Sequence, residues 1–183
     1  MKNLLVKGFL VLPLLLSIAP ALAQNTPATV VSIGDGDTLR VRQAGQVKTL
    51  RLGCVDAPER AQSPWGQQST SRLKQLLPAG TAVQVREITS DAEGGSLRDL
   101  RYGRTVAELY LGKQSVNLQM VKDGQAVVYR QYLNGCAATK DQYLQAEAQA
   151  KRQRLGFWNQ KSPVMPWEYR RGKRNNKPYK SIL

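Results

Sequence analysis

Two short acidic motifs in the first third of the chain are the residues best suited to chemistry. The first is Asp35-Gly36-Asp37-Thr38, and the second, Arg51-Leu52-Gly53-Cys54-Val55-Asp56-Ala57-Pro58-Glu59, follows shortly after it. Carboxylates that a fold brings together repel one another unless a cation neutralises them, and a hard divalent ion such as Ca²⁺ takes oxygen ligands of this kind. The two motifs therefore predict a metal site with an arginine beside it.

The rest of the chain is strongly basic, with 27 Lys and Arg against 13 Asp and Glu and a formal net charge of +14 at pH 7. Such a field attracts phosphates, anionic membranes or acidic polysaccharides without choosing among them. The chain has no histidine, which excludes Ser-His-Asp, Cys-His and imidazole-based nuclease sites. Acid–base work then falls to carboxylates, Arg, Lys, Tyr or metal-bound water. An acidic pocket in a basic protein indicates metal-assisted chemistry on a polyanion.

Residues 1–23 have the pattern of a secretory signal peptide. Lys2 and Lys7 flank the start of an apolar run over 9–18, and Ala21-Leu22-Ala23 is a small-residue cleavage pattern. The apolar run is too short to span a bilayer, although an uncleaved membrane anchor is the alternative. We expect a secreted or periplasmic protein with no membrane span after removal of the signal, long enough for one domain.

The chain has two cysteines, Cys54 and Cys136. An exported chain meets an oxidising environment, so a disulfide between them is favoured over two buried free thiols. Two cysteines so far apart are too few for a structural zinc site. The bond would tie the segment that carries Asp56 to the loop that follows Tyr132.

Alternating and β-branched patterns predict five strands, at 28–33, 38–42, 47–52, 81–88 and 104–111. Apolar periodicity with capping residues predicts three helices, at 64–77, 116–124 and 140–154, which follow Ser63, Ser115 and Thr139 as N-caps. A five-stranded OB-type barrel requires this order, with a helix between the third and fourth strands. We therefore expect an α+β fold, an OB-type β-barrel with three packed helices, over residues 24–158.

Residues 159–183 are expected to be a basic C-terminal extension rather than a second domain. Six cations lie in its second half: Arg170, Arg171, Lys173, Arg174, Lys177 and Lys180. They would add phosphate contacts and steepen the salt dependence of binding to nucleic acid. The alternative is that Trp167 and Tyr169 pack back onto the barrel and make the extension structural.

Four motifs resemble those of the staphylococcal nuclease family, in the same order and with similar gaps over residues 29–158. They are Asp35-Gly36-Asp37-Thr38, Arg51-Leu52 with Asp56-Ala57-Pro58-Glu59, Tyr102-Gly103-Arg104, and 147–151 before Leu155-Gly156-Phe157-Trp158. The resemblance implies a calcium-dependent, sugar-nonspecific endonuclease on an OB-type core. It also implies attack of water on phosphorus, which leaves 3′-phosphorylated products from DNA and RNA.

The same resemblance implies the ligands of the metal and of the phosphate. Asp37 and Asp56 would bind Ca²⁺ together with the backbone carbonyl of Ala57, where the family often has threonine and uses only the carbonyl. Arg51 and Arg104 would contact the scissile phosphate, because guanidinium groups offer paired donors that match phosphate oxygens and stay charged at any working pH.

Further roles are implied for residues around this centre. Glu59 would activate or orient the attacking water; beside a metal and two arginines it stays ionised and is a weak base, so both roles remain open. Asp35 would lie near the metal without binding it, or would only form the turn. Tyr102 and Tyr132 would frame the nucleotide pocket by stacking on a base, with core packing as the alternative for Tyr132.

Two other functions remain open from the sequence. One is a catalytically silent nucleic-acid-binding OB module, which the fold and charge equally permit. The retained arginines and carboxylates argue against it, because a pure binder has no need for carboxylates near phosphate. The other is a basic protein that adheres to anionic envelope polymers through residues 170–180. We expect nonspecific, phosphate-driven binding of DNA and RNA by a monomer.

Overall fold

Five strands close into a barrel in a computed structural model, which describes residues 25–88, 98–99 and 103–175. The barrel strands are β1 (Thr26–Ile33), β2 (Thr38–Gln43), β3 (Gln46–Leu52), β5 (Ala82–Glu87) and β7 (Arg104–Leu111). Antiparallel neighbours follow the order β3-β2-β1-β5-β7, and a parallel pairing of β3 with β7 closes the barrel. The predicted α+β fold with a five-stranded OB-type barrel is confirmed.

The alternation that predicts the strands is also what fills the barrel. Along β2, Leu39 and Val41 are fully buried, whereas Arg40 and Arg42 are exposed. Successive side chains of a strand point to opposite faces, so a period of two gives one apolar face and one solvated face. The inward residues of the other strands join the same core, among them Leu50, Leu52, Val83, Val85 and Leu109.

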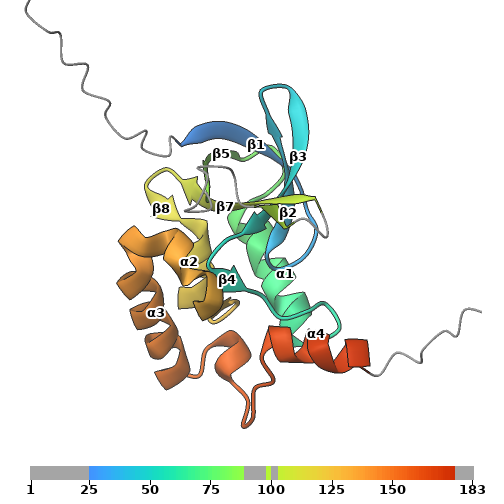
Figure 1. The fold of residues 1–183 in the computed structure, drawn as a ribbon, viewed down its shortest axis with the longest axis vertical. Helices are drawn as coiled ribbons and strands as arrows, with labels where there is room; N and C mark the ends of the chain where they lie inside the picture. The colour runs from blue at the N-terminus through green and yellow to red at the C-terminus, as the bar shows by residue number, and fades with distance from the viewer. Residues whose placement is uncertain (1–24, 89–97, 100–102, 176–183) are drawn as a thin grey trace, which may run out of the picture.

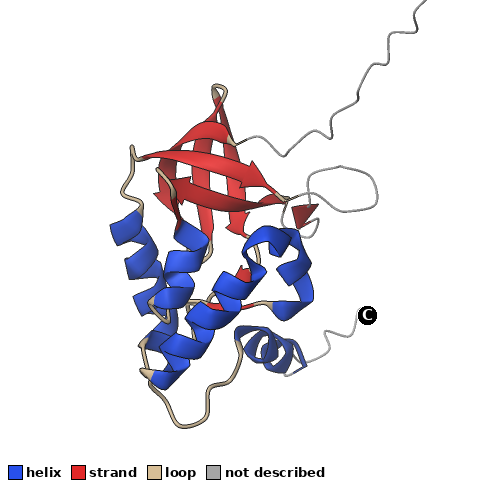
Figure 2. Cartoon of the chain, turned by 90° about the vertical axis from the view of Figure 1, so that its left-hand side faces the viewer, coloured by secondary structure: helices blue, strands red, loops and turns tan. Residues whose placement is uncertain are grey.

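Helices gather at one end of the barrel, below the strands in Figure 2. The described chain has four α-helices: α1 (Trp65–Leu76), α2 (Val116–Lys122), α3 (Lys140–Arg152) and α4 (Pro166–Asn175). Two 3₁₀ segments, η1 (Arg130–Thr139) and η2 (Gly156–Trp158), lie before and after α3. The first three helices lie where they are predicted. The fourth is an addition, because α4 forms within the segment expected to be an extension (Figure 1).

Of the three predicted N-cap residues, one differs in the structure and one makes no side-chain hydrogen bond to its helix. Ser115 caps α2 as expected, accepting a hydrogen bond from the amide of Leu118 at 3.2 Å. The N-cap of α1 is Pro64 instead of Ser63, after a cis Ser63–Pro64 bond and without a side-chain cap. Thr139 is the N-cap residue of α3 as predicted, but its hydroxyl donates to the carbonyl of Cys136 and makes no capping hydrogen bond.

A short strand pair and a disulfide connect the segment after β3 to the helical end of the molecule. β4 (Val55–Asp56) pairs antiparallel with β9 (Val127–Val128). Cys54, immediately before β4, forms a disulfide with Cys136 of η1, which confirms the predicted bond. Two further two-residue strands, β6 (Arg98–Asp99) and β8 (Gln114–Ser115), pair with β7. The segment that carries Asp56 is therefore held from two sides.

The N-terminal and loop predictions fall partly outside the described residues. The signal peptide expected over 1–23 and the nucleotide-pocket residue Tyr102 lie there. Within the described ranges, no helix is both long enough and apolar enough to cross a membrane.

Candidate active site

Adjacent strands bring the predicted phosphate and metal ligands to one edge of the barrel. Thr38, next to Asp37, pairs with Arg51 across β2 and β3, and the Leu52 amide donates to the carbonyl of Asp37 at 2.8 Å. β7 lies on the other side of β3 and begins at Arg104. Residues far apart in sequence thus meet because β3 lies between β2 and β7.

The turn that carries Asp37 depends on a glycine. The backbone amide of Asp37 donates to the Asp35 carboxylate at 3.1 Å, which gives Asp35 its role as turn-former. A Cβ on Gly36 would clash with Ser69 of α1 and lie 2.7 Å from the Cβ of Ala57. Only glycine lets the turn approach α1 and the β4 segment this closely. Burial and the nearby charge of Asp37 raise the pKa of Asp35 above its usual value.

Arg51 bridges the two predicted metal ligands. Its Nη1 donates to Asp37 Oδ1 at 3.1 Å and its Nη2 to Asp56 Oδ1 at 2.6 Å. The second Asp37 oxygen accepts from the Ala57 amide at 3.1 Å. Burial by itself lowers the pKa of the Arg51 guanidinium, but the charges of Asp37 and Asp56 outweigh it and raise that pKa above its usual value.

Arg104 reaches the same centre through a hydroxyl. Its Nη1 donates to Thr38 Oγ1 at 2.9 Å, and this hydroxyl donates to Asp37 Oδ1 at 3.1 Å. The two predicted phosphate ligands, Arg51 and Arg104, are therefore linked to one carboxylate. An anion that approaches this edge would meet both guanidinium groups.

A third arginine, which the sequence reasoning missed, occupies the other side of Asp56. Arg170 of α4 donates from Nη2 to Asp56 Oδ2 at 2.7 Å and from Nη1 to Asp56 Oδ1 at 3.0 Å. The same Nη1 donates to Glu59 Oε1 at 2.7 Å. Burial raises the pKa of the Asp56 carboxyl, and the hydrogen bonds from Arg170 oppose that rise. The sequence signal was the pair Trp167 and Tyr169, whose aromatic rings favour a packed helix over a solvated tail.

Aromatic rings flank the arginines. Tyr132 is 46% exposed and meets Tyr129 edge to face, with ring centroids 4.8 Å apart. Tyr129 in turn stacks on Trp167 at 5.2 Å with an interplanar angle of 8°. Burial and the charge of Asp56 raise the pKa of the Tyr129 hydroxyl. Tyr132 therefore lies at the exposed end of a partly buried aromatic cluster, outside the core.

The donor set suits a hard divalent cation. Asp37 and Asp56 present carboxylate oxygens, and the carbonyl of Ala57 follows directly after Asp56. Within the described residues, no group of three or more His, Cys, Asp and Glu side chains is arranged to hold a metal ion. Two carboxylates and a carbonyl would leave the remaining positions of a calcium ion to water, as Ca²⁺ accepts six to eight oxygen ligands.

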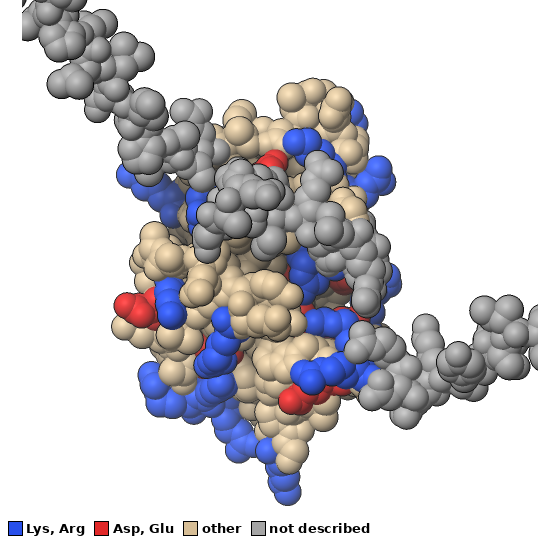
Figure 3. Space-filling view, viewed as in Figure 1, with Lys and Arg blue, Asp and Glu red and all other residues tan. Residues whose placement is uncertain are grey.

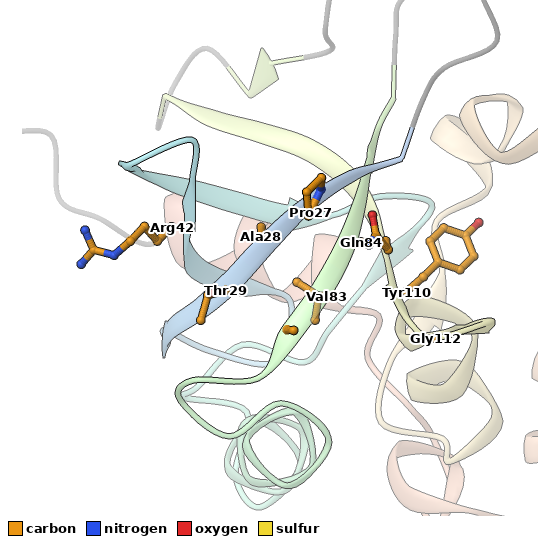
Figure 4. Close-up of a pocket in the computed structure, with 9 residues that line it drawn as sticks. Pro27, Ala28, Thr29, Arg42, Val83, Gln84, Tyr110 and Gly112 are labelled. Atoms are coloured by element: carbon orange, nitrogen blue, oxygen red, sulfur yellow. The ribbon is translucent and has the colours of Figure 1, made fainter.

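The wider surface is basic, and a hollow away from the candidate site differs from it in chemistry. Lys and Arg side chains are spread over the barrel and the helical end in Figure 3, with few acidic atoms among them. A hollow of about 310 Å³ lies over β1 and β5 (Figure 4). Arg42 and Tyr110 lie at opposite ends of it, and it shares no residue with the Asp37–Arg51–Asp56 centre.

The sequence is similar to known proteins over most of its length. Residues 49–160 match the family model described as "Staphylococcal nuclease homologue". An "Uncharacterized endonuclease" of Haemophilus influenzae is 34% identical over 154 residues, covering 84% of this chain and 78% of its own. A "Micrococcal nuclease" of Shigella flexneri is 36% identical over 155 residues, covering 80% and 81%. The family match ends before α4 begins.

Proposed function

The chain belongs to the staphylococcal nuclease family, and we propose that it is a calcium-dependent, sugar-nonspecific endonuclease that hydrolyses DNA and RNA to 3′-phosphorylated products. Membership of a nuclease family makes nucleic acid its substrate class and confirms the resemblance found from the four motifs. The observation that carries the finer proposal is the bridge that Arg51 makes between the buried carboxylates of Asp37 and Asp56.

Arg51 and Arg104 would bind the scissile phosphate. Charge accumulates on the phosphate oxygens as phosphoryl transfer proceeds, so a positioned guanidinium stabilises the transition state more than the ground state. Arg51 is held by two carboxylates and Arg104 by Thr38. Both are thereby preorganised, which reduces the loss of side-chain freedom on binding.

Asp37, Asp56 and the carbonyl of Ala57 would hold the cation. A bound divalent cation supplies Lewis-acid polarisation of a phosphoryl oxygen and favours ionisation of a coordinated water. The two aspartates lie on opposite sides of Arg51, so cation and phosphate ligands would share one small centre. This proximity is what a metal-assisted attack on phosphate requires.

Glu59 is assigned to the attacking water. Its side chain is 39% exposed and shares a guanidinium nitrogen with Asp56, which places it at the solvent edge of the centre. From there it can accept a hydrogen bond from a water that approaches phosphorus. Comparing the pH dependence of turnover in the wild type and in Glu59→Gln decides whether Glu59 removes the proton or only orients the water.

The rival functions use less of this geometry. A silent OB-type binder would use the barrel and its charge, but it has no use for Arg51 between two buried carboxylates. An envelope-adhering protein would present its C-terminal cations to solvent. Arg170 instead binds Asp56 and Glu59.

We further propose that the protein is exported and acts as a secreted or periplasmic monomer. The signal pattern over 1–23 supports export, and the disulfide between Cys54 and Cys136 suits an oxidising compartment.

The test is degradation of plasmid DNA and of RNA by the full chain, with Ca²⁺ and with excess chelator. We expect cleavage of both substrates with Ca²⁺, none with chelator, and 3′-phosphate ends on the products. Asp37→Ala should lose most of the activity without unfolding the barrel, although the lost bonds to Arg51 and the Ala57 amide lower its melting temperature. Undiminished cleavage in excess chelator would refute the metal mechanism, and binding without cleavage under all conditions would favour the silent OB module.

A further inference from the structure

The C-terminal helix contributes a side chain to the centre of the site. Arg170 takes both oxygens of Asp56 and one of Glu59, at 2.7 to 3.0 Å. Asp56 is fully buried, whereas the Arg170 side chain is 36% exposed. A guanidinium bonded in this way is a strong counter-ion, yet it lies at the edge from which it can leave toward solvent.

α4 is docked by contacts that converge on the loop carrying Glu59. The Tyr169 hydroxyl donates to the carbonyl of Ala61 at 2.9 Å. The side-chain amide of Gln62 donates to the carbonyl of Val164 at 3.0 Å, just before α4. Trp167 packs on Tyr129 and on the small apolar cluster around Phe157 and Trp158. The helix is therefore seated so that Arg170 points at Asp56.

Both oxygens of Asp56 accept hydrogen bonds from guanidinium groups in this arrangement. Oδ2 accepts from Arg170, and Oδ1 accepts from both Arg170 and Arg51. A divalent cation binds carboxylate oxygens through the same lone pairs that these donors use. A cation at Asp56 therefore competes with the guanidinium groups and is repelled by their charge, and Arg170 is the more exposed of the two, at 36% against 15% for Arg51.

We propose that α4 is an internal closure of the site, in which Arg170 competes with the divalent cation for Asp56 and Glu59, so that cation binding releases Arg170 and loosens α4 by removing one of the contacts that dock it. This inference rests on the proposed function, since it presumes a cation at Asp37 and Asp56. Arg51 remains in place because it is also bonded to Asp37. Arg170 and the cation then exclude each other at Asp56.

The test measures cation binding without nucleic acid, by calorimetric titration of the full chain with Ca²⁺. Arg170→Ala should bind Ca²⁺ about tenfold more tightly than the wild type, because the charge-assisted bonds to a buried carboxylate no longer have to be broken. Arg171→Ala is the matched control: it removes the same charge from the next, exposed residue of α4. It should leave the affinity close to that of the wild type.

A second measurement on the wild type covers the case in which Arg170→Ala fails to fold. Amide hydrogen exchange over 166–175 should speed up on addition of Ca²⁺, while exchange in β2 and β3 does not. Equal Ca²⁺ affinity in the two variants, weaker binding by Arg170→Ala, or unchanged or slower exchange in α4 would overturn the closure and leave the nuclease proposal standing. Failure of every variant to bind Ca²⁺ would overturn both.

Discussion

Glu108 and Asp56 are both fully buried acids paired with arginine, yet their surroundings differ. Glu108 of β7 accepts from Arg86 of β5 and from the hydroxyls of Tyr110 and Tyr143, at 3.0 and 2.7 Å. One carboxylate thus meets one cation, and neutral hydroxyls fill its remaining lone pairs. Burial and the charge of Glu108 raise the pKa of the Tyr143 hydroxyl, so it stays protonated and remains a donor.

Around Asp56 the numbers of carboxylates and arginines differ from those around Glu108. Two further carboxylates, Asp37 and Glu59, share its arginines, and all of the side chains bonded to Asp56 are cations. Glu108 has a structural role, because its hydrogen-bond donors come from the barrel and α3 and satisfy its carboxylate. Asp56 is neutralised partly by a helix that lies outside the family match. A buried acid whose arginine partners are shared with other carboxylates and can be replaced by a ligand indicates a binding site. A buried acid whose hydrogen bonds are all made by fixed neighbours indicates a structural role.

The largest effect that this comparison predicts is on turnover. Arg51→Lys keeps the charge but loses the fork that holds two carboxylates and a phosphate, so turnover should fall about a thousandfold. Steady-state cleavage of DNA with saturating Ca²⁺ measures it. Arg40→Lys, on the exposed face of β2, is the matched control and should keep normal turnover. Normal turnover in Arg51→Lys would show that Arg51 is only structural.

The second effect is on stability and should appear at the other acid. Glu108→Gln leaves Arg86 without its carboxylate and should lower the free energy of unfolding by about 3 kcal/mol, as expected for a broken buried pair. Urea denaturation measures the loss. Turnover per folded molecule should not change. A loss of turnover with unaltered stability would erase the distinction between the two centres.

A third effect combines both properties at the turn. Gly36→Ala places a methyl group against Ser69 and Ala57, so it should lower stability by about 1–3 kcal/mol and reduce turnover by shifting Asp37. Gly172→Ala adds a methyl group in open space and serves as the comparison. The idea fails if Gly36→Ala matches Gly172→Ala in both melting temperature and turnover.

The smallest effect concerns pH and a third buried acid, Glu147 of α3. Burial acts to raise its pKa, but bonds from Lys151, the Val128 amide and Arg130 outweigh burial and lower it below its usual 4.5. The pKa of Glu147 is lower in the folded than in the unfolded chain. Its contribution to the stability of the fold is therefore complete above the unfolded pKa and is lost as pH falls through the folded pKa. The stability gap between the wild type and Glu147→Gln should therefore narrow from pH 7 to pH 3. A constant gap would contradict this assignment.

The parts of the fold that follow local sequence patterns could be predicted from the sequence. Strands β2, β3 and β7 were predictable because alternation and the glycine turns are local signals. Their adjacency, and with it the gathering of Asp37, Arg51 and Arg104, came from the family resemblance. The roles of these residues stay predictions, although the structure brings the side chains together.

α4 and Arg170 could not be predicted in this way. Residues 170–180 have a run of cations that is typical of a solvated tail. The bond from Arg170 to Asp56 joins residues 114 apart in sequence, and no periodic pattern signals it. Likewise, the hydroxyl of Thr139 donates to the carbonyl of Cys136 instead of capping its helix, because a local bond to the preceding turn competes with the cap.

The most direct test of the central claim is turnover of Asp56→Asn in the full chain, with saturating Ca²⁺ and DNA. The asparagine keeps the shape of the side chain but removes the charge that would hold the cation. We predict loss of most of the turnover and of Ca²⁺ binding in a chain that still folds, with a lower melting temperature because Arg51 and Arg170 lose a buried charged partner. Normal turnover with normal Ca²⁺ binding would contradict the claim that this buried carboxylate is the centre of a metal-dependent nuclease site.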